Sequence, residues 1–431
     1  MSKNKAFSNA KWIIICRIVQ SVLQLIVGML TARYLGPSNY GLINYAKSVV
    51  ALIGPFTQLG LNATLVRELV ESPEKEGEIM GTSLLMSLVS GSCSIGAVFC
   101  FASLANSGEV QTIIVCVLYS IALLFQSVEL IQYWFHSKLQ SKFPSIMMLC
   151  AYIVVSAYKM LLLVAGKNVY WFAVVYSIEY GIVGLSLLAI YHKQKTQKLT
   201  VSMAMAKKLF ARSRYYILSS LMVTMFQNTD HIMLKMMSGD AENGMYTAAI
   251  TCASVFSFVY AAIIDSMRPV ILSKKKEGAL DYENNIAKLY CIVTYLALMQ
   301  GIGFTLLAKP IVLVLFGAEY IAAVPVLQVL VWYISFSQMG RVRNVWVLAE
   351  EKQQILWKIN LSGALINIVI NAITIPFMGA LGAALASLVT QFFTNFVLGF
   401  VLKTLRKNNR ILIKGISPLL LVSSLKELKP R

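Results

Sequence analysis

Long apolar runs separated by short polar segments dominate this chain. The hydrocarbon core of a bilayer is about 30 Å thick, so a helix that crosses it needs about 20 mostly apolar residues. Runs of this length lie roughly at residues 12–33, 40–61, 80–104, 110–135, 145–165, 169–191, 215–237, 244–267, 286–308, 322–348, 355–376 and 381–403. The pattern predicts an all-α integral membrane protein with about 12 transmembrane helices.

The carboxy-terminal end carries one further apolar run, at residues 411–425. This run is short, and Lys414 and Pro418 interrupt it. It therefore fits an interfacial helix, or a stunted thirteenth span, better than a full crossing.

The longest polar connection, residues 192–214, separates two sets of six runs. Sliding the halves by 203 residues places residues 40–46 over residues 243–249, each at the junction between the first and second run of its half. Because six crossings return the chain to the same side, the repeats are expected to be parallel, with a pseudo-two-fold axis along the membrane normal. Two such lobes enclose a central cleft and reach alternating access by rocking. The predicted domains are an amino-terminal six-helix lobe (1–195), a cytoplasmic linker (196–214), a carboxy-terminal six-helix lobe (215–405) and a basic tail (406–431).

Composition excludes a soluble globular protein, because 58% of the residues are apolar and only 13% are charged, against about 25% charged in ordinary soluble domains. The net charge of +19 is concentrated in the connections on one side and in the tail. Cytoplasmic loops retain Lys and Arg, so both termini are predicted to be cytoplasmic, and nucleic acid is not needed to explain the charge.

Two cations lie inside predicted spans without an acidic residue three or four positions away. Arg17 lies about 8 Å from the inner end of the first span, and Lys47 about 10 Å from the outer end of the second. Ionisable residues in a bilayer interior indicate function by default. Both side chains are long enough to snorkel; together they can also form a cationic wall, accompanied by the polar residues Gln20 and Asn44.

Other internal charges occur in groups. Lys159 and Glu179, on neighbouring antiparallel spans at similar depth, are predicted to form a structural ion pair. Asp265 and Arg268, three positions apart, are predicted to form another.

Asp230 and His231, which directly follow Asn228 and Thr229, form the best candidate for ion coupling. Histidine titrates near neutrality, and desolvation raises the pKa of a carboxyl group toward that range. Adjacent residues on a helix point about 100° apart, so a structural polar cap is an equal alternative. Asn360, Asn367 and Asn371 share one helical face, which suits either a wet cavity or polar contacts between helices.

Motifs for enzymatic chemistry are missing from the sequence. It contains no Walker loop, no His-Glu-x-x-His and no nucleophile elbow, and its cysteines lack zinc-binding spacing. The outer connections are short. We therefore expect neither an enzyme nor a metal or cofactor site.

Several segments are similar to one family of transporters. They are Thr31–Gly41, Leu59–Asn62, Val66–Leu69, Asn228–Leu234, Gly244–Ala249, Asn367–Pro376 and Gly379–Ala386. Together they resemble the bacterial polysaccharide flippases, which are the O-antigen and capsule repeat-unit transporters of the multidrug/oligosaccharidyl-lipid/polysaccharide exporter superfamily. The resemblance extends over about residues 8 to 405.

The resemblance implies a two-lobed transporter of the bacterial inner membrane that flips undecaprenyl-diphosphate-linked oligosaccharides toward the periplasm for surface polysaccharide biosynthesis. The diphosphate needs cations, for which Arg17 and Lys47 are placed best, with Gln20, Asn44 and Asn228 beside the substrate. Proton or sodium coupling through Asp230, and polymerase or chain-length partners, are further implications.

Two alternatives belong to other classes of protein. A drug/cation antiporter of the same fold needs an anionic cleft, whereas the unpaired internal charges of this chain are mostly basic. A polysaccharide polymerase is an enzyme that usually carries a large periplasmic loop, and no such loop is evident here.

Overall fold

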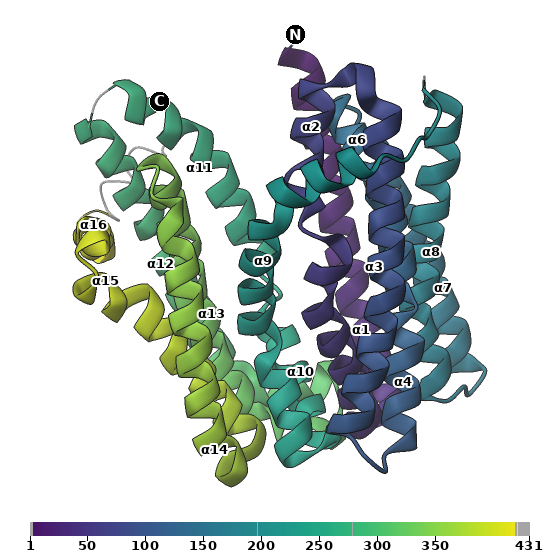
Figure 1. Cartoon of the computed structure of the whole chain (residues 1–431). Helices are drawn as coiled ribbons and strands as arrows, with labels where there is room; N and C mark the ends of the chain where they lie inside the picture. Colours follow the sequence, from purple (N-terminus) through teal and green to yellow (C-terminus); the bar gives the residue numbers. More distant parts are fainter. Residues whose placement is uncertain (1–2, 196, 278, 419, 421–431) are drawn as a thin grey trace. The chain divides into compact units, whose positions relative to one another are not determined.

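The computed structural model describes residues 3–195, 197–277, 279–418 and 420, without the side chains of residues 3–18, 276–277 and 279–281. This part contains helices and no strand, as predicted. The first half has α1 (Lys3–Gln58), α2 (Leu65–Glu71), α3 (Glu76–Ala105), α4 (Val110–Ser120), α5 (Ala122–Glu129), α6 (Ile131–Ser137), α7 (Lys142–Val164) and α8 (Val169–Gln194) (Figure 1). It is followed by α9 (Met203–Ser238), α10 (Asp240–Ala253), α11 (Ser257–Glu277), α12 (Ala279–Leu315), α13 (Ala323–Ala349), α14 (Leu356–Phe392), α15 (Leu398–Val401) and α16 (Arg406–Ile416).

Membrane-crossing segments account for most of these helices. Among the described residues, seven helical stretches are long and apolar enough to cross a bilayer, and α10 with α11, bent by 47°, form an eighth. The stretch that includes α14 is broken at Gly379, and α1 is broken at Gly36, so each holds two segments in succession. The seven stretches include α4 to α6 as one interrupted span. When α14 and α1 are each counted as two segments, and α10 with α11 and α9 as one each, the described chain accommodates the twelve predicted segments.

Backbone conformation repeats between the two halves. Gly36 (φ 70°) and Gly239 (φ 90°) are 203 residues apart, which is the spacing that aligned the two halves of the sequence. Both have a ψ close to 180°, a region that is open essentially to glycine alone. Positive-φ glycines also occupy the next two turns on the same side of each half: Gly108, Gly166, Gly317 and Gly379. The parallel repeat is therefore present in the turns as well as in the spans.

Two compact units emerge from the contacts, Met1–Met236 and Met237–Arg431, and we call them unit 1 and unit 2. In unit 1, small polar side chains join three helices. Thr57 on α1 donates to Ser94 Oγ on α3 at 2.9 Å, and Ser127 on α5 donates to the Ser87 carbonyl on α3 at 2.8 Å. Such bonds hold helices together where water is absent.

The segment predicted as a linker is partly helical. Residues 203–214 form the first turns of α9, and Met205 and Leu209 are buried in the core of unit 1. Just before them, the backbone N–H of Thr200 donates to the Gly77 carbonyl on α3 at 3.2 Å. Packing against α3 therefore fixes the path of this connection.

Glu68 anchors the same turns of α9 electrostatically. Its buried carboxylate lies 2.8 Å from the Lys208 ammonium and also accepts a hydrogen bond from Arg212. Burial alone would raise the pKa of Glu68, but the hydrogen bonds from Lys208 and Arg212 outweigh it and lower the pKa below its ordinary value. The ionised form is thus the form that the fold stabilises.

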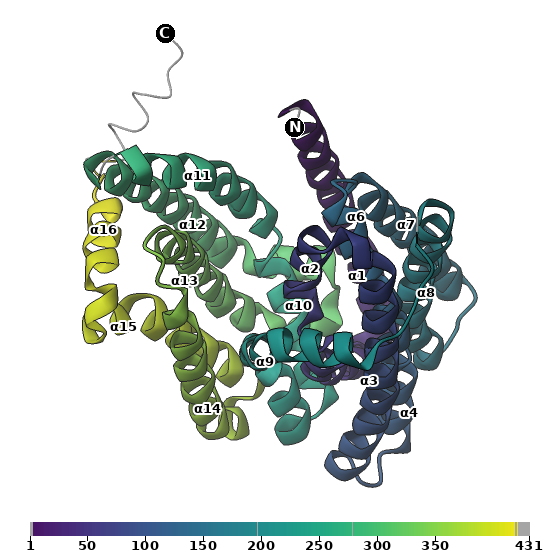
Figure 2. The same ribbon diagram turned by 45° about the horizontal axis from the view of Figure 1, so that its top comes forward.

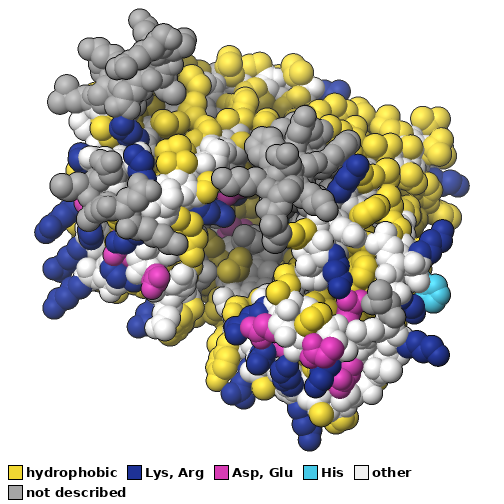
Figure 3. All heavy atoms as spheres, turned by 90° about the horizontal axis from the view of Figure 1, so that it is seen from above, with side chains coloured by type: hydrophobic (Ala, Val, Ile, Leu, Met, Phe, Trp, Pro, Cys, Tyr) yellow, Lys and Arg dark blue, Asp and Glu magenta, His cyan; other side chains and the backbone are white. Residues whose placement is uncertain are grey.

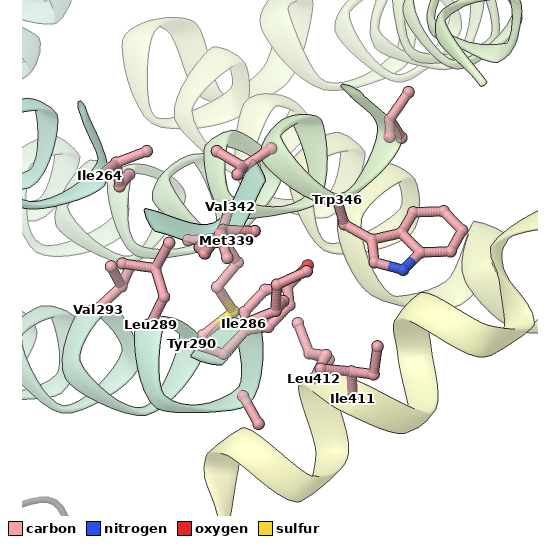
Figure 4. Packing of buried hydrophobic residues seen from close by; sticks show 14 of the residues in the cluster. Ile264, Ile286, Leu289, Tyr290, Val293, Met339, Val342, Trp346, Ile411 and Leu412 are labelled. Carbon is pink, nitrogen blue, oxygen red and sulfur yellow. The ribbon is translucent and has the colours of Figure 1, made fainter. Parts of the chain in front are cut away.

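Unit 2 has its apolar core between α11, α12, α13 and α16. Tyr290 and Ile286 of α12, Trp346 of α13 and Leu412 of α16 are almost completely buried in it, and Figure 4 shows Ile411 and Leu412 directed at α12. α16 also bonds to α12, because Tyr290 Oη donates to Asn408 Oδ1 at 3.0 Å. α16 is therefore docked onto the unit.

α16 runs across the spans. Figure 1 shows it end-on, whereas α12 and α13 appear along their lengths. Its 11 residues are too few to cross a bilayer, so the interfacial alternative describes residues 406–416. Residue 419 and residues 421–425 of the predicted run lie outside the described residues.

Gly239→Ala should lower stability by about 1–3 kcal/mol, because the backbone conformation itself penalises a side chain. A Cβ at Gly239 would meet no atom within 4 Å, so crowding does not contribute. Gly96 in α3 is equally open, but it is helical, so Gly96→Ala should raise stability by up to about 1 kcal/mol. Thermal unfolding of both variants in one detergent measures the difference; shifts of the same sign would contradict the assignment.

Glu68→Gln should cost about 2 kcal/mol, since charge-assisted hydrogen bonds to two cations are lost. Glu71→Gln is the matched control, because the Glu71 side chain is 42% exposed and pairs with Arg67, and it should change stability little. The wild-type contribution is complete above pH 4.5 and disappears as pH falls through the lowered pKa of Glu68. The midpoint of thermal unfolding should therefore fall more steeply with acid in the wild type than in Glu68→Gln. Parallel pH profiles would refute this role.

Candidate functional site

Three internal charges of unit 1 form one electrostatic group. Lys47 lies on α1 after the kink, Lys159 on α7 and Glu179 on α8, and α7 packs against both α1 and α8. Lys47 and Lys159 each attract Glu179, and the two lysines repel one another. We call these residues the Lys47 cluster; it has two cations and one carboxylate.

The structural ion pair predicted between Lys159 and Glu179 is an attraction without direct contact, and its role stays a prediction. Among the described residues, no ammonium of the cluster lies within 4.0 Å of the Glu179 carboxylate. Lys47 also attracts this carboxylate, less strongly than Lys159 does. Lys159 and Glu179 are half-buried, whereas Lys47 is exposed. By formal charge, the cluster therefore holds one cation more than it holds carboxylates.

Aromatic hydroxyl groups lie next to Glu179 on α8. The Tyr176 ring stacks on Tyr119 of α4 with centroids 4.3 Å apart, and Tyr176 Oη donates to Tyr180 Oη at 3.3 Å. Gln126 of α5 donates to Tyr176 Oη at 3.5 Å. The sequence prediction missed these residues, although the spacing of Tyr176 and Tyr180 by four, around Glu179, was a usable signal.

The remaining predicted residues of α1 are not joined to the cluster by any described contact. The side chain of Arg17 lies outside the described residues, and Gln20 is half-buried. Asn44 donates to the Tyr40 carbonyl of its own helix at 2.8 Å. A role for Arg17, Gln20 and Asn44 in binding stays a prediction.

On α9, the candidate residues differ in their surroundings. Asn228 donates to the Thr224 carbonyl of its own helix at 2.9 Å. Asp230 is buried, with 6% of its surface exposed, and His231 is half-buried. This difference accords with adjacent helical residues pointing about 100° apart, and ion coupling by either residue stays a prediction.

Lys235, near the end of α9, forms an ion pair that the sequence did not reveal. Its buried ammonium lies 2.6 Å from Glu109 Oε2, just before α4. Hydrogen bonds from Lys235 and from Thr112 lower the pKa of Glu109. Together with Glu68 at the other end, this pair fixes α9 to unit 1 at both ends.

In unit 2, Arg343 is a buried cation inside a span. It lies in α13, within the run predicted at residues 322–348, and is only 7% exposed. One guanidinium nitrogen, Nη1, donates to the Thr394 carbonyl and to Asn395 Oδ1, both at 2.8 Å. Arg343 therefore has polar partners within the packed helices, which the sequence pattern did not reveal.

The other polar residues of unit 2 have structural contacts. Arg268 Nη2 lies 2.9 Å from Asp265 Oδ1, as their spacing predicts. Asn371 donates to Asn367 Oδ1 at 3.0 Å, and both are buried. This contact lies within α14, so the choice between a wet cavity and polar contacts between helices stays open for Asn367 and Asn371.

Comparison with known proteins gives evidence on the family and the fold that the geometry of the side chains does not give. Over 400 residues, the chain is 21% identical to the capsular polysaccharide biosynthesis protein CapF of Staphylococcus aureus, which covers 89% of this chain and 96% of the relative. Its fold matches the lipid II flippase MurJ in an inward closed conformation, with a TM-score of 0.71, 15% identity and coverage of 97% of this chain and 93% of MurJ.

A multidrug resistance MATE transporter of the MOP superfamily, in an inward-facing conformation, also has this fold. Its TM-score is 0.64, at 15% identity, and the match covers 91% of this chain and 99% of the transporter. At such low identity, these two likenesses show a shared fold. The family model described as "Polysaccharide biosynthesis protein" matches residues 6–275. The chain therefore belongs to the polysaccharide biosynthesis protein family, and it has the transporter fold of MurJ and of the MATE proteins of the MOP superfamily.

Proposed function

We propose that this protein flips undecaprenyl-diphosphate-linked oligosaccharide repeat units across the cytoplasmic membrane for surface polysaccharide biosynthesis. The family and the fold support a membrane transporter in polysaccharide biosynthesis. The observation that carries the finer proposal is the Lys47 cluster, in which two lysines and one glutamate lie on α1, α7 and α8, with α7 packed against the other two.

A cation inside a bilayer is costly, and it is retained where it meets a charged ligand or a wet path. The diphosphate of the lipid carrier is such a ligand, and charge-assisted hydrogen bonds to phosphate are stronger than neutral ones. Lys47 supplies the exposed ammonium, while Glu179 neutralises part of the charge and keeps release feasible. The apolar tail of the carrier stays in the bilayer while the headgroup passes.

The tyrosines beside the cluster suit the sugar. Tyr119, Tyr176 and Tyr180 combine flat apolar faces with hydroxyl groups, a combination that favours ligands with apolar and polar sides. The parallel repeat supports alternating access by the two halves. We place both termini in the cytoplasm, because Lys and Arg concentrate on that side, and we extend the proposal to proton or sodium coupling and to polymerase partners.

Drug export of the MATE kind is the second candidate, because a MATE transporter shares the fold. A cationic drug needs an accessible carboxylate. Glu179 is such a group, but two lysines attract it. The charge of the cluster therefore favours an anionic substrate, and the polymerase alternative has no supporting observation.

Lys47→Gln should reduce export strongly, because it removes the exposed ammonium that meets the diphosphate. The loss of one charge-assisted contact is about 1.5–3 kcal/mol, which is roughly a tenfold to hundredfold loss of affinity. When Lys47→Gln is expressed in a strain that lacks the wild-type protein, untranslocated lipid-linked repeat units should accumulate. Lys47→Arg, expressed in the same strain, should restore much of the export.

Lys167→Gln is the matched control, because it removes one exposed lysine from the same unit outside the spans. Wild-type export by Lys47→Gln, at equal protein level, would remove the basis of the proposal. Resistance to cationic drugs that falls in Lys47→Gln while glycan export persists would favour the second candidate.

Asp230→Asn tests the coupling proposal separately. If Asp230 carries the coupling ion, export by this variant should become slow and insensitive to ionophores that collapse the proton or sodium gradient. The measurement is the rate of repeat-unit appearance on the outer side, with and without each ionophore. An ionophore response equal to that of the wild type would show that Asp230 is structural.

A further inference from the structure

Five basic side chains of unit 2 line one cavity beside α16. The cavity has a volume of about 530 Å³, which lies in the range of small-molecule sites. Its lining residues are Glu283, Asn284, Lys403, Arg406, Lys407, Arg410, Ile411 and Lys414. With one carboxylate against five cations, the cavity has an excess of four positive charges.

The basic residues share one face of the chain at this point. Arg406, Arg410 and Lys414 recur every four residues along α16, which places them in one row. The opposite face buries Leu412 and Gly415 against α12. In Figure 3, dark blue side chains gather along the left edge, the side on which Figure 2 shows α16.

Fixed contacts hold the floor of the cavity in place. Lys407 Nζ lies 2.8 Å from Glu283 Oε1, and Lys414 Nζ donates to Asn284 Oδ1 at 2.7 Å. The pair with Glu283 raises the pKa of Lys407. Arg406 uses only its Nε for the Phe400 carbonyl, at 3.2 Å, which leaves the terminal guanidinium nitrogens for a ligand. Planar guanidinium groups suit phosphate, since they can bind it with two parallel hydrogen bonds.

The depth of the cavity indicates which phosphate it meets. Glu283 and Asn284 lie in α12 just before the apolar run predicted at residues 286–308, so the cavity lies beside the end of a span. Ile413 and Ile416, exposed on the same short helix, offer apolar surface at that level. An amphipathic helix with basic and apolar faces at an interface is typical of contact with anionic lipids.

We infer that the cavity formed by α16 and the start of α12 binds the phosphate headgroup of an anionic phospholipid of the surrounding leaflet. Arg406, Arg410 and Lys403 contact the phosphate, and Lys407 and Lys414 position the helix through Glu283 and Asn284. This site is separate from the Lys47 cluster and does not depend on the transported substrate. Occupancy fastens α16, and through it the start of α12, to the membrane surface.

Photo-crosslinking tests the site directly. Full-length protein in phosphatidylcholine nanodiscs is titrated with a diazirine-bearing phosphatidylglycerol, and the labelled peptides are mapped. Labelling should concentrate within residues 403–416. Arg406→Gln/Arg410→Gln should raise the half-saturating lipid fraction about fivefold for each charge removed. Lys193→Gln/Lys198→Gln, which removes two exposed lysines of unit 1, should leave labelling of α16 unchanged.

Glu283→Gln supplies a change of opposite sign. Glu283 is the one carboxylate among the described lining residues, so its removal releases Lys407 from its 2.8 Å pair and should tighten lipid binding, which loss of folding cannot mimic. Weaker labelling in Glu283→Gln, or labelling of α16 that ignores both arginines, would overturn the proposal. A further experiment adds inorganic phosphate, or chloride at equal ionic strength, as a competitor of the labelled lipid. Displacement by phosphate alone would assign the cavity to a soluble phosphate and refute the lipid.

Discussion

The cost of placing a charge in a low-dielectric bilayer governs the arrangement of this protein. Each charged side chain found inside the membrane-spanning part must have a partner, a polar path or a ligand. Lys235 meets Glu109, Arg343 meets the Thr394 carbonyl and Asn395, and Lys159 is balanced by Glu179. Lys47 differs, because it is exposed and shares the carboxylate of Glu179 with a second lysine. This difference is why Lys47, and not the other cations, is the residue on which the proposed binding role rests.

Much of the fold could be predicted because a bilayer of fixed thickness requires apolar runs of a minimum length. The spans follow from apolar runs of sufficient length, and the parallel repeat follows from an even number of crossings. The offset of 203 residues that aligned the halves also aligns Gly36 with Gly239, two glycines with the same unusual backbone conformation. The apolar runs determine how many times the chain crosses the bilayer, whereas the turns need glycine at particular positions. Both signals can be read from a single sequence.

The candidate site was less predictable, because hydropathy says nothing about which faces of different helices meet. Glu179 was paired with Lys159 from depth alone, and the competing attraction of Lys47 arises only once α1, α7 and α8 pack together. Arg343 lies inside a predicted span, but its bond to Asn395 could not be predicted, since a cation near a span end looks the same in sequence whether it reaches water or a polar partner. Tyr176 and Tyr180 were passed over because aromatic residues are common in all spans.

The two halves share a backbone plan, but the charged residues inside them differ, and this difference bears on how the protein works. Matching glycine turns show that both halves have the same backbone plan. Yet the Lys47 cluster belongs to unit 1, whereas unit 2 carries the bonded Arg343 and the basic cavity beside α16. A repeat that kept identical charges in both halves would offer two equivalent sites. In the two proposed roles, unit 1 holds an anionic headgroup inside the membrane and unit 2 binds phosphate at its surface, and each role depends on charges that belong to one half of the repeat.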